Sequence, residues 1–271
     1  MYDSDAPRTP ILTELRNLYR YRGLIRLLVA KDLTVRYRRS ILGAGWTLLQ
    51  PLLTTAVMWV IFSNVFHRDG REGVPFIVYL LSGVIVAHTF TQGVVAAGSA
   101  IVSSRPILTK MHVPPEVFSY TAALSAGAHF LISLALLLVA QLATGVGVPW
   151  TFLLVPIPLV CLLALVTGLG LIVAASAVRF YDVIPLTAVL AGLAAYLIPT
   201  FYPIDMIGPK FQVIIKANPL YSYLKVLRGF VYEGRFAEGW TFIVMGGSAA
   251  LALALGVWIF SRSWKSMVVH L

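Results

Sequence analysis

The sequence has few charged residues and a single cysteine. Only 12% of its 271 residues are Asp, Glu, Lys or Arg, about half the share in an ordinary soluble domain, whereas 59% are hydrophobic. The mean hydropathy is +0.85. Cys161 has no second cysteine to pair with in the chain, which excludes a disulfide-stapled secreted scaffold. The shortage of charge excludes a water-soluble globular enzyme and a disordered chain, and it indicates a polytopic membrane protein.

Several catalytic motifs are also absent. The sequence contains no GxxxxGK[ST] phosphate-binding loop, no GxSxG and no HExxH. Its five histidines show no metal-ligand spacing, so we expect no metal site. The apolar runs contain no Asp, Glu, Lys or Arg, which argues against an ion-coupled carrier. His88 to Gln92 is the most polar cluster within them, and we interpret His88 as a residue that hydrogen-bonds between helices. Catalysis within this chain is therefore not expected.

Six apolar runs are long enough to cross about 30 Å of hydrocarbon as helices. The sequence predicts an all-α, six-helix transmembrane domain over residues 43–260. Its predicted spans are residues 43–66, 75–102, 117–144, 149–178, 183–204 and 240–260. Prolines inside these spans are expected to kink them, and they are Pro51, Pro156, Pro158, Pro185 and Pro199.

The basic residues indicate how the spans are oriented. Residues 1–42 hold nine Lys and Arg, and placing this segment inside puts 14 of the 21 basic residues on the inner side. The positive-inside rule then places both termini, residues 1–42 and 261–271, in the cytoplasm. The net charge of +10 is explained by this orientation rather than by binding to nucleic acid.

Two segments on the predicted inner side are neither spans nor simple loops. Residues 11–31 have apolar side chains at helical spacing with basic residues between them, which predicts an amphipathic helix in the cytoplasmic interface. Such a helix either rests against anionic lipid or transmits motion from a cytoplasmic partner. Residues 103–116 form a short helix-and-turn segment, which is either an ordinary inner turn or a docking element for a soluble partner.

On the outer side, residues 205–239 are too long for a turn and too apolar for a solvated loop. Asn218 and Pro219 break the segment near its middle. We expect two short re-entrant helices that dip into the outer leaflet, with a compact extracellular cap as the alternative.

A specific motif lies at the entry to the first span. The run LVAKDLTVRYRRSILG, residues 28–43, continues into Trp46 and then Gln50-Pro51-Leu52. It resembles the corresponding region of the ABC-2 permeases that export polysaccharides and polyol phosphates, such as the Wzm-like O-antigen, teichoic-acid and galactan exporters. Residues 107–110 with Pro114-Pro115-Glu116 are similar to that family's coupling segment. Asn218-Pro219-Leu220 with Arg228 is similar to its motif before the sixth span.

The resemblance implies a bacterial plasma-membrane homodimer that works with two copies of a cytoplasmic ATPase. ATP and Mg would then bind that partner and not this chain, and the substrate would be a glycan on polyprenyl pyrophosphate. By resemblance, the ATPase-coupling residues are Arg105, Pro106, Ile107, Leu108, Lys110 and Met111. The residues of the interface helix and its approach to the first span are Lys31, Asp32, Arg36, Tyr37, Arg38 and Arg39.

A sugar polymer needs a wide lumen, and aromatic faces suit the C–H faces of sugar rings. The aromatic candidates for such a lining are Trp46, Tyr79, Phe90, Tyr196, Phe201, Tyr202 and Tyr223. Packing or an interfacial belt is the alternative role for each of them. Arg36, Arg38 and Arg39 are candidates to receive the pyrophosphate, with positive-inside anchoring as the alternative.

Two other functions remain open at this point. An ABC-2 permease for a small hydrophobic drug or a lipid would share the topology. A membrane-embedded glycosyltransferase would instead need acidic catalytic residues at a membrane face. The sequence offers only scattered candidates for that role, among them Asp182, Asp205, Glu233 and Glu238.

Overall fold

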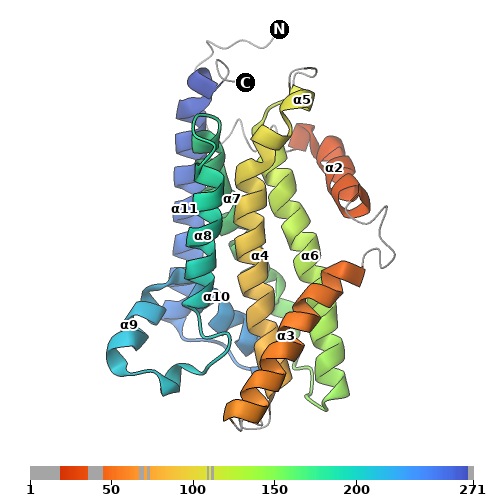
Figure 1. Cartoon of the computed structure of the whole chain (residues 1–271), viewed down its shortest axis with the longest axis vertical. Helices are drawn as coiled ribbons and strands as arrows, with labels where there is room; N and C mark the ends of the chain where they lie inside the picture. The colour runs from red at the N-terminus through yellow and green to blue at the C-terminus, as the bar shows by residue number, and fades with distance from the viewer. Residues whose placement is uncertain are drawn as a thin grey trace.

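The computed structural model describes residues 19–35, 45–66, 70–71, 74–108, 110 and 113–267. Within these residues the chain is mostly helical, and its long helices run along one axis of the molecule (Figure 1). They are α3 (Gly45–Phe66), α4 (Phe76–Ser103), α6 (Glu116–Ala143), α7 (Pro156–Ala177), α8 (Val183–Tyr196) and α11 (Gly239–Met267). The start of α2 and the end of α11 lie toward the same end of the bundle.

Four helical stretches are long and apolar enough to cross a membrane. They are Phe76–Ser103, Glu116–Ala143, Trp150–Ala177 and Gly239–Ser263, of which the third joins the short helix η1 (Trp150–Leu154) to α7. At 1.5 Å per residue, a 28-residue helix such as α4 measures about 42 Å, which exceeds the hydrocarbon thickness. Leu48–Asn64 of α3 and Val183–Tyr196 of α8 are shorter apolar helices.

The core of the bundle is built around α4 and α7. The α4 helix packs against α3, α6, α7 and α8, and α7 packs against α11 on its other side. Gly168 of α7 and Gly256 of α11 allow the two backbones to touch, because a Cβ atom on either glycine would meet main-chain atoms of the other helix. Close approach of small residues is the usual way in which membrane helices gain packing energy.

Most of the prolines lie where a helix tolerates them. Pro156 and Pro158 are in the first turn of α7, and Pro185 is in the first turn of α8. The N–H groups of a first turn have no partner in the helix, so proline costs little there and causes no kink. Among the predicted kink sites, only Pro51 lies well inside a helix, in α3.

The fifth predicted span differs most from the structure. We predicted a helix over residues 183–204, but α8 ends at Tyr196, and the chain then bends through residues 197–203. Pro199 has no N–H to continue the helix, and it disfavours the helical conformation of the residue before it. A 14-residue helix measures only about 21 Å.

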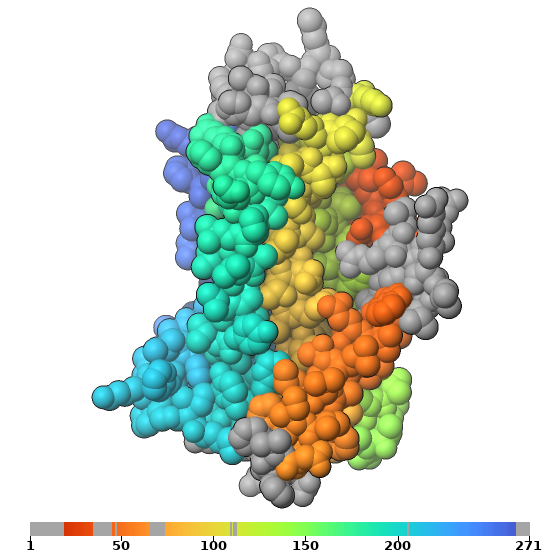
Figure 2. Space-filling view, in the orientation of Figure 1, coloured from red at the N-terminus to blue at the C-terminus, as the bar shows by residue number. Residues whose placement is uncertain are grey.

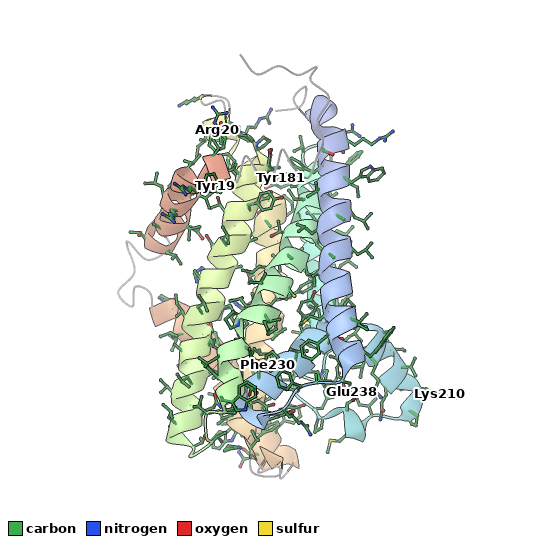
Figure 3. All side chains as sticks on the ribbon, turned by 180° about the vertical axis from the view of Figure 1, so that it is seen from behind. Tyr19, Arg20, Tyr181, Lys210, Phe230 and Glu238 are labelled. Carbon is green, nitrogen blue, oxygen red and sulfur yellow. The ribbon has the colours of Figure 1, made fainter. Side chains whose placement is uncertain are left out.

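The remaining elements lie at the two ends of the bundle. At the end where α11 finishes are α2 (Arg22–Val35), which packs on α6, and the four-residue helix α5 (Arg105–Leu108). At the other end are the hairpin of β1 (Gly70–Arg71) and β2 (Val74–Pro75), η2 (Ile204–Met206), α9 (Pro209–Ala217), α10 (Pro219–Arg228) and η3 (Gly229–Glu233). Figure 3 places Tyr19, Arg20 and Tyr181 at the first end and Lys210 and Glu238 at the second.

Between these ends the surface of the subunit is largely apolar. On α8, four large aliphatic side chains are more than half exposed, namely Leu186, Val189, Leu190 and Leu193. Figure 2 shows α8 running along this face of the molecule. Apolar surface of this extent needs lipid or another membrane helix to cover it.

Candidate functional site

The predicted site residues gather at the two ends of the helix bundle. The end with α2 and α5 carries the predicted coupling elements, and the opposite end carries α9, α10 and η3 (Figure 1). We call them the inner end and the outer end, after the orientation that the sequence predicts.

At the inner end, α2 is an amphipathic helix held against the bundle. Its Ile25 is buried, while Leu27 on another side is exposed. The α2 helix begins at Arg22. The part of the predicted interface helix that precedes residue 19 lies outside the described residues. Lys31 and Asp32 lie on the part of α2 that faces α4 and α6, where they line a groove between those helices.

The α5 helix is a single turn that directly follows α4. The backbone N–H groups of Ile107 and Leu108 both donate to the Ser104 carbonyl, at 2.9 and 3.0 Å. Arg105, Pro106 and Lys110 are exposed, whereas Ile107 and Leu108 are half-buried. The exposed residues are therefore the part of the predicted coupling segment that a soluble partner can contact without disturbing this subunit.

Leu108 packs against a small hydrophobic cluster that contains Ile101 and Leu171, and Ile107 lines the groove between α4 and α6. The inward position of these two side chains gives α5 a rigid attachment to α4 and α7. Met111 and the predicted approach residues Arg36, Tyr37, Arg38 and Arg39 lie outside the described residues.

At the outer end, Asn218 joins two short helices at the break that the sequence predicts. Its side-chain oxygen accepts the Leu220 N–H at 3.1 Å, which caps α10, and its Nδ2 donates to the Ala194 carbonyl of α8 at 2.7 Å. Pro219 occupies the first position of α10, where its fixed φ favours the helix. Asn218 thus ties the turn between α9 and α10 to α8.

Arg228, the last residue of α10, is a buried charge with several hydrogen bonds. Its side chain is 7% exposed. Nε donates to Ser82 Oγ at 3.1 Å, Nη1 to the Pro199 carbonyl at 3.0 Å and Nη2 to the Tyr79 carbonyl at 3.1 Å. The guanidinium also lies 3.7 Å from the centre of the Tyr79 ring. All of its acceptors are neutral, and within the described residues no carboxylate pairs with it.

The same contacts hold the bent segment that follows α8. The Tyr79 hydroxyl lies 2.9 Å from the carbonyl oxygens of both Pro199 and Tyr202. Gly83 allows this approach, because a Cβ there would lie 2.7 Å from Thr200 Cγ2. Residues 198–200 are buried as a result. Backbone carbonyls that have left a helix are thus satisfied by side chains of α4 and α10, as the interior of a membrane protein requires.

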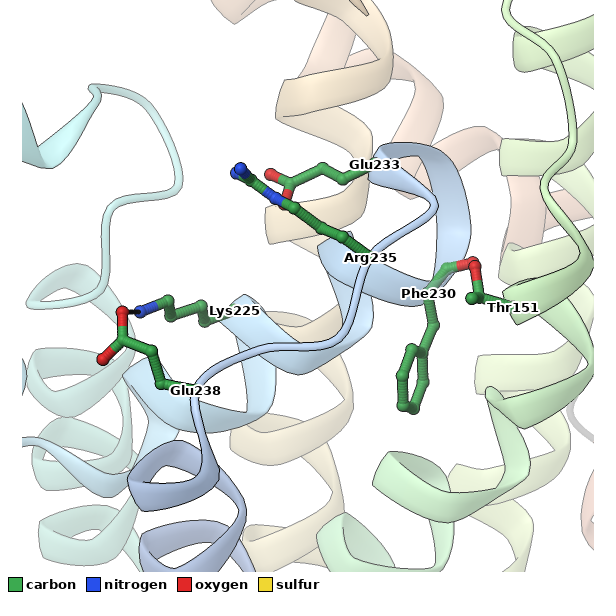
Figure 4. Close-up of polar contacts among 6 residues, drawn as sticks. All are labelled: Thr151, Lys225, Phe230, Glu233, Arg235 and Glu238. Carbon is green, nitrogen blue, oxygen red and sulfur yellow. Dashed lines mark hydrogen bonds and ion pairs between the residues drawn. The ribbon is translucent and has the colours of Figure 1, made fainter.

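A cavity of about 1100 Å³ lies beside this cluster at the outer end. It is lined by Tyr79 and Arg228 and by two ion pairs, Lys225–Glu238 and Arg235–Glu233, each 2.8 Å long (Figure 4). The hydrogen bond from Lys225 holds the pKa of the Glu238 carboxyl below its usual value. Because that pKa is lowered, the pair persists near neutral pH and is lost only as the pH falls through the lowered value.

At the outer end, polar side chains of two other elements donate hydrogen bonds to backbone carbonyls of η3. Thr151 of η1 donates to the Phe230 carbonyl at 2.9 Å, and Gln141 of α6 donates to the Val231 carbonyl at 2.9 Å (Figure 4 shows the first). Phe230 and Val231 lie in the last turn of η3, where backbone carbonyls have no partner within the helix, and these side chains donate to them.

The aromatic residues proposed for a lumen fall into three sets. Tyr79, Phe90 and Tyr223 are buried in the core of the subunit, and the Tyr223 hydroxyl donates to the Met245 carbonyl at 2.9 Å. Trp46 is about half exposed and Tyr196 is 70% exposed. Phe201 and Tyr202 are half-buried near the bend after α8. In this conformation, only the second and third sets present surface to a neighbouring molecule.

Sequence reasoning did not single out the burial of Arg228, nor the polar groove along α4 and α6. The groove is lined by His88 and Gln92 from the cluster noted in the sequence, and it continues on α6 with Ser125, His129 and Ser133. Their spacing of four residues was a visible signal for one helix face. Among the described residues, no cluster of His, Cys, Asp or Glu is arranged to hold a metal ion.

Comparison with known proteins identifies a family whose model matches this chain. The model of the family described as ABC-2 type transporter matches residues 23–232. The O-antigen export system permease protein RfbA of Myxococcus xanthus is 30% identical over 254 residues, covering 93% of this chain and 95% of that protein. A Klebsiella pneumoniae protein of the same name is 27% identical, covering 78% and 81%. The polysialic acid transport protein KpsM of Escherichia coli is 20% identical, covering 90% and 95%.

Proposed function

The chain belongs to the ABC-2 type transporter family, and we propose that it is the membrane permease subunit of a polysaccharide exporter. Its substrate on this proposal is a glycan carried on polyprenyl pyrophosphate, such as an O-antigen, a teichoic acid or a cell-wall galactan. The observation that carries the proposal is the match over nearly the whole chain to relatives named as O-antigen export permeases. The relative named for polysialic acid transport supports the same substrate class.

The energy for export comes, on this proposal, from a separate cytoplasmic ATPase. The sequence has no phosphate-binding loop of its own, so ATP and Mg would bind the partner and this chain would bind no cofactor. The exposed Arg105, Pro106 and Lys110 on α5 would meet the ATPase together with α2, including Lys31 and Asp32. Ile107 and Leu108 would pass the motion of α5 to α4 and α7, against which they pack.

We also propose that all six apolar helices cross the membrane. The four long stretches meet the length requirement, and α3 has 22 residues. The fifth crossing would combine α8 with the buried segment that follows it, whose carbonyls Arg228 and Tyr79 satisfy. The outer helices α9 and α10 would enter the outer leaflet as a re-entrant pair. The excess of basic residues in residues 1–42 supports a cytoplasmic location for both termini at the plasma membrane.

A homodimer would provide the wide passage that a polymer needs, because one six-helix subunit can hardly enclose it. The apolar outer face of α8 and the exposed aromatic side chains of Trp46 and Tyr196 support a surface completed by another membrane helix. The buried candidates Tyr79, Phe90 and Tyr223 would line the passage only after a rearrangement of the core. Arg36, Arg38 and Arg39 would receive the pyrophosphate at the inner end, since arginine matches phosphate oxygens bidentately.

The test is to deplete this protein in its own organism and to extract and size the lipid-linked glycans on each face of the membrane. We expect full-length polymer to accumulate on the cytoplasmic face, because synthesis continues while export stops. The accumulated polymer would also identify the glycan. Unchanged glycan pools would contradict the proposal and favour a permease for a small hydrophobic compound or a lipid. Shortened polymer would favour a synthetic enzyme instead.

A further inference from the structure

The facing sides of α4 and α6 carry polar side chains through the middle of the bundle. On α4 these are His88, Thr89, Gln92, Ser99 and Ser103, and on α6 they are Thr121, Ser125, His129 and Ser133. On α6 they recur every four residues, and on α4 they lie one, three, seven and four residues apart, so on each helix they form one stripe on one face. Both helices are otherwise apolar and of membrane-spanning length.

The two stripes border a groove of about 370 Å³. Its lining runs from His88 to Ser103 on α4 and from Phe118 to Ser133 on α6, which is about 22 Å along each helix at 1.5 Å per residue. The α2 helix closes the inner end with Leu28, Lys31 and Asp32. Figure 2 shows α6 between α4 and α2 on this face, and in Figure 1 the α3 helix crosses the outer parts of α4 and α6. The groove therefore extends from the inner end over about two-thirds of the hydrocarbon thickness.

Several polar groups of this groove are left without a protein partner. The Gln92 side chain is exposed and makes no hydrogen bond to any described residue. The Ser125 hydroxyl is 97% enclosed, since the residue is 3% exposed, and it too has no hydrogen-bond partner among the described residues. Lipid tails cannot supply such partners, and an unsatisfied polar group in hydrocarbon is costly. The groove therefore holds water or a polar ligand in the working transporter.

The chemistry of the lining distinguishes between the two parts of a lipid-linked glycan. Apart from the histidines, the titratable side chains of the lining are Lys31 and Asp32, whose charges are opposite and which lie at the inner mouth. A pyrophosphate would call for a cluster of cations, whereas hydroxyl groups are matched by neutral donors and acceptors such as amides and hydroxyls. The volume falls within the range of pockets that hold small molecules.

We propose that the groove between α4 and α6 binds neutral sugar residues of the exported glycan on the cytoplasmic half of its route. The proposal rests on the proposed function and deepens it by assigning a carbohydrate-binding surface of hydrogen-bonding side chains. Gln92 and Ser133 are the residues through which the sugar hydroxyls replace water. The pyrophosphate end of the carrier binds elsewhere.

Cysteine labelling tests whether the groove holds water and sugar. In the full transporter carrying Cys161→Ala, we would introduce Ser133→Cys, with Leu131→Cys as a control two residues away on the lipid-facing side of α6. Inverted membrane vesicles would be treated with a charged methanethiosulfonate. Because the thiolate reacts only where water reaches it, we expect Ser133→Cys to react at least about tenfold faster than Leu131→Cys. Equal, slow reaction at both positions would overturn the proposal.

The same vesicles distinguish sugar from water alone. They would be prepared from cells that make the glycan and from cells in which its first sugar transfer is blocked. We expect slower labelling of Ser133→Cys when glycan is present and no change at Leu131→Cys. A rate at Ser133→Cys that does not depend on the glycan would show a water-filled groove without a carbohydrate site, and it would overturn the proposal.

Export by Gln92→Leu gives an independent measurement, with Thr91→Val as the matched control. Thr91 lies at the same depth, outside the groove, and its hydroxyl donates to the Ala87 carbonyl of its own helix at 2.9 Å. We expect Gln92→Leu to slow the appearance of glycan outside several-fold at normal protein level, and Thr91→Val to export normally. Normal export by Gln92→Leu would overturn the groove proposal. It would not bear on the proposed function, which depletion of the whole protein tests separately.

Discussion

Arg228 connects several segments of this fold through one side chain. Its three donors join the start of α4, the end of α10 and the bent segment after α8. Without Arg228, the Pro199 carbonyl would keep only the Tyr79 hydroxyl and the Tyr79 carbonyl would keep the Ser82 hydroxyl, so three bonds from a charged donor would be lost in a buried site. The charge itself needs no counter-ion, because neutral acceptors and the face of Tyr79 surround it.

We predict that Arg228→Met lowers the free energy of unfolding by about 3 kcal/mol, since it removes three hydrogen bonds that a charged group makes in a buried site. Arg228→Lys should recover only part of this loss, because a single ammonium group cannot reproduce the planar fork of donors. Thermal unfolding of the purified transporter in detergent measures the effect. Lys225→Met on the same helix is the control, and its exposed ion pair should contribute less than about 1 kcal/mol. Equal stability of the two methionine variants would contradict this role of Arg228.

The sequence identified Arg228 as part of a motif but not as a buried residue. Its partner Ser82 is 146 residues away, and no local pattern reports a contact across that separation. The same holds for the groove, whose two walls are separate helices. By contrast, the role of Asn218 as a break and a cap was predictable, because the cap bonds to a group two residues away.

Helices were the most predictable elements. A long apolar run has to satisfy its own backbone groups in lipid, so the helical state follows from hydropathy alone. The prediction for residues 183–204 was wrong at its end, because hydropathy does not register the backbone consequences of Pro199. Side-chain donors from α4 and α10 stabilise the bend there, and only the tertiary structure shows them.

The contact between α7 and α11 can be tested by replacing each of two glycines of α11 with alanine. We expect Gly256→Ala to destabilise the protein by about 1–3 kcal/mol, because its Cβ would meet the backbone of Gly168 on α7. Gly247→Ala should be neutral or stabilising by up to about 1 kcal/mol, since a Cβ there meets no atom within 4 Å and alanine favours the helix. Unfolding of both variants under identical conditions measures the difference. Effects of the same sign would show that α7 and α11 do not pack as closely as described.

The α5 helix leads to a prediction about coupling. We expect the double change Arg105→Glu and Lys110→Glu to reduce both co-purification of the ATPase and glycan export by at least about tenfold, because these exposed charges lie where the partner would dock. The membrane level of the protein should not change. Lys210→Glu reverses an exposed charge at the outer end and serves as the control (Figure 3). Normal co-purification of the ATPase with the double variant would place the docking surface elsewhere.

At the scale of the whole molecule, the surface of the subunit is that of a protein embedded in a membrane. This is so although every described contact lies within one chain. Its charged and polar labelled residues lie at the two ends in Figure 3, and the apolar faces of α8 and α11 lie between them. The α11 helix is mostly exposed, whereas α4 is mostly buried. A monomer with these surfaces is stable only in lipid or beside another membrane protein, which agrees with the membrane transporter family to which it belongs.

The orientation of the whole molecule can be measured because the chain has only one cysteine. In the Cys161→Ala background, Lys210→Cys at the outer end and Tyr181→Cys at the inner end place single thiols on exposed sites. We expect a membrane-impermeant maleimide to label Lys210→Cys in intact spheroplasts and to label Tyr181→Cys only after the membrane is opened, because 14 of the 21 basic residues favour the cytoplasmic side for the end that carries the termini. The cysteine-free parent controls for background. The reverse labelling pattern would place both termini outside, and the exposed residues of α5 would then face away from any cytoplasmic ATPase.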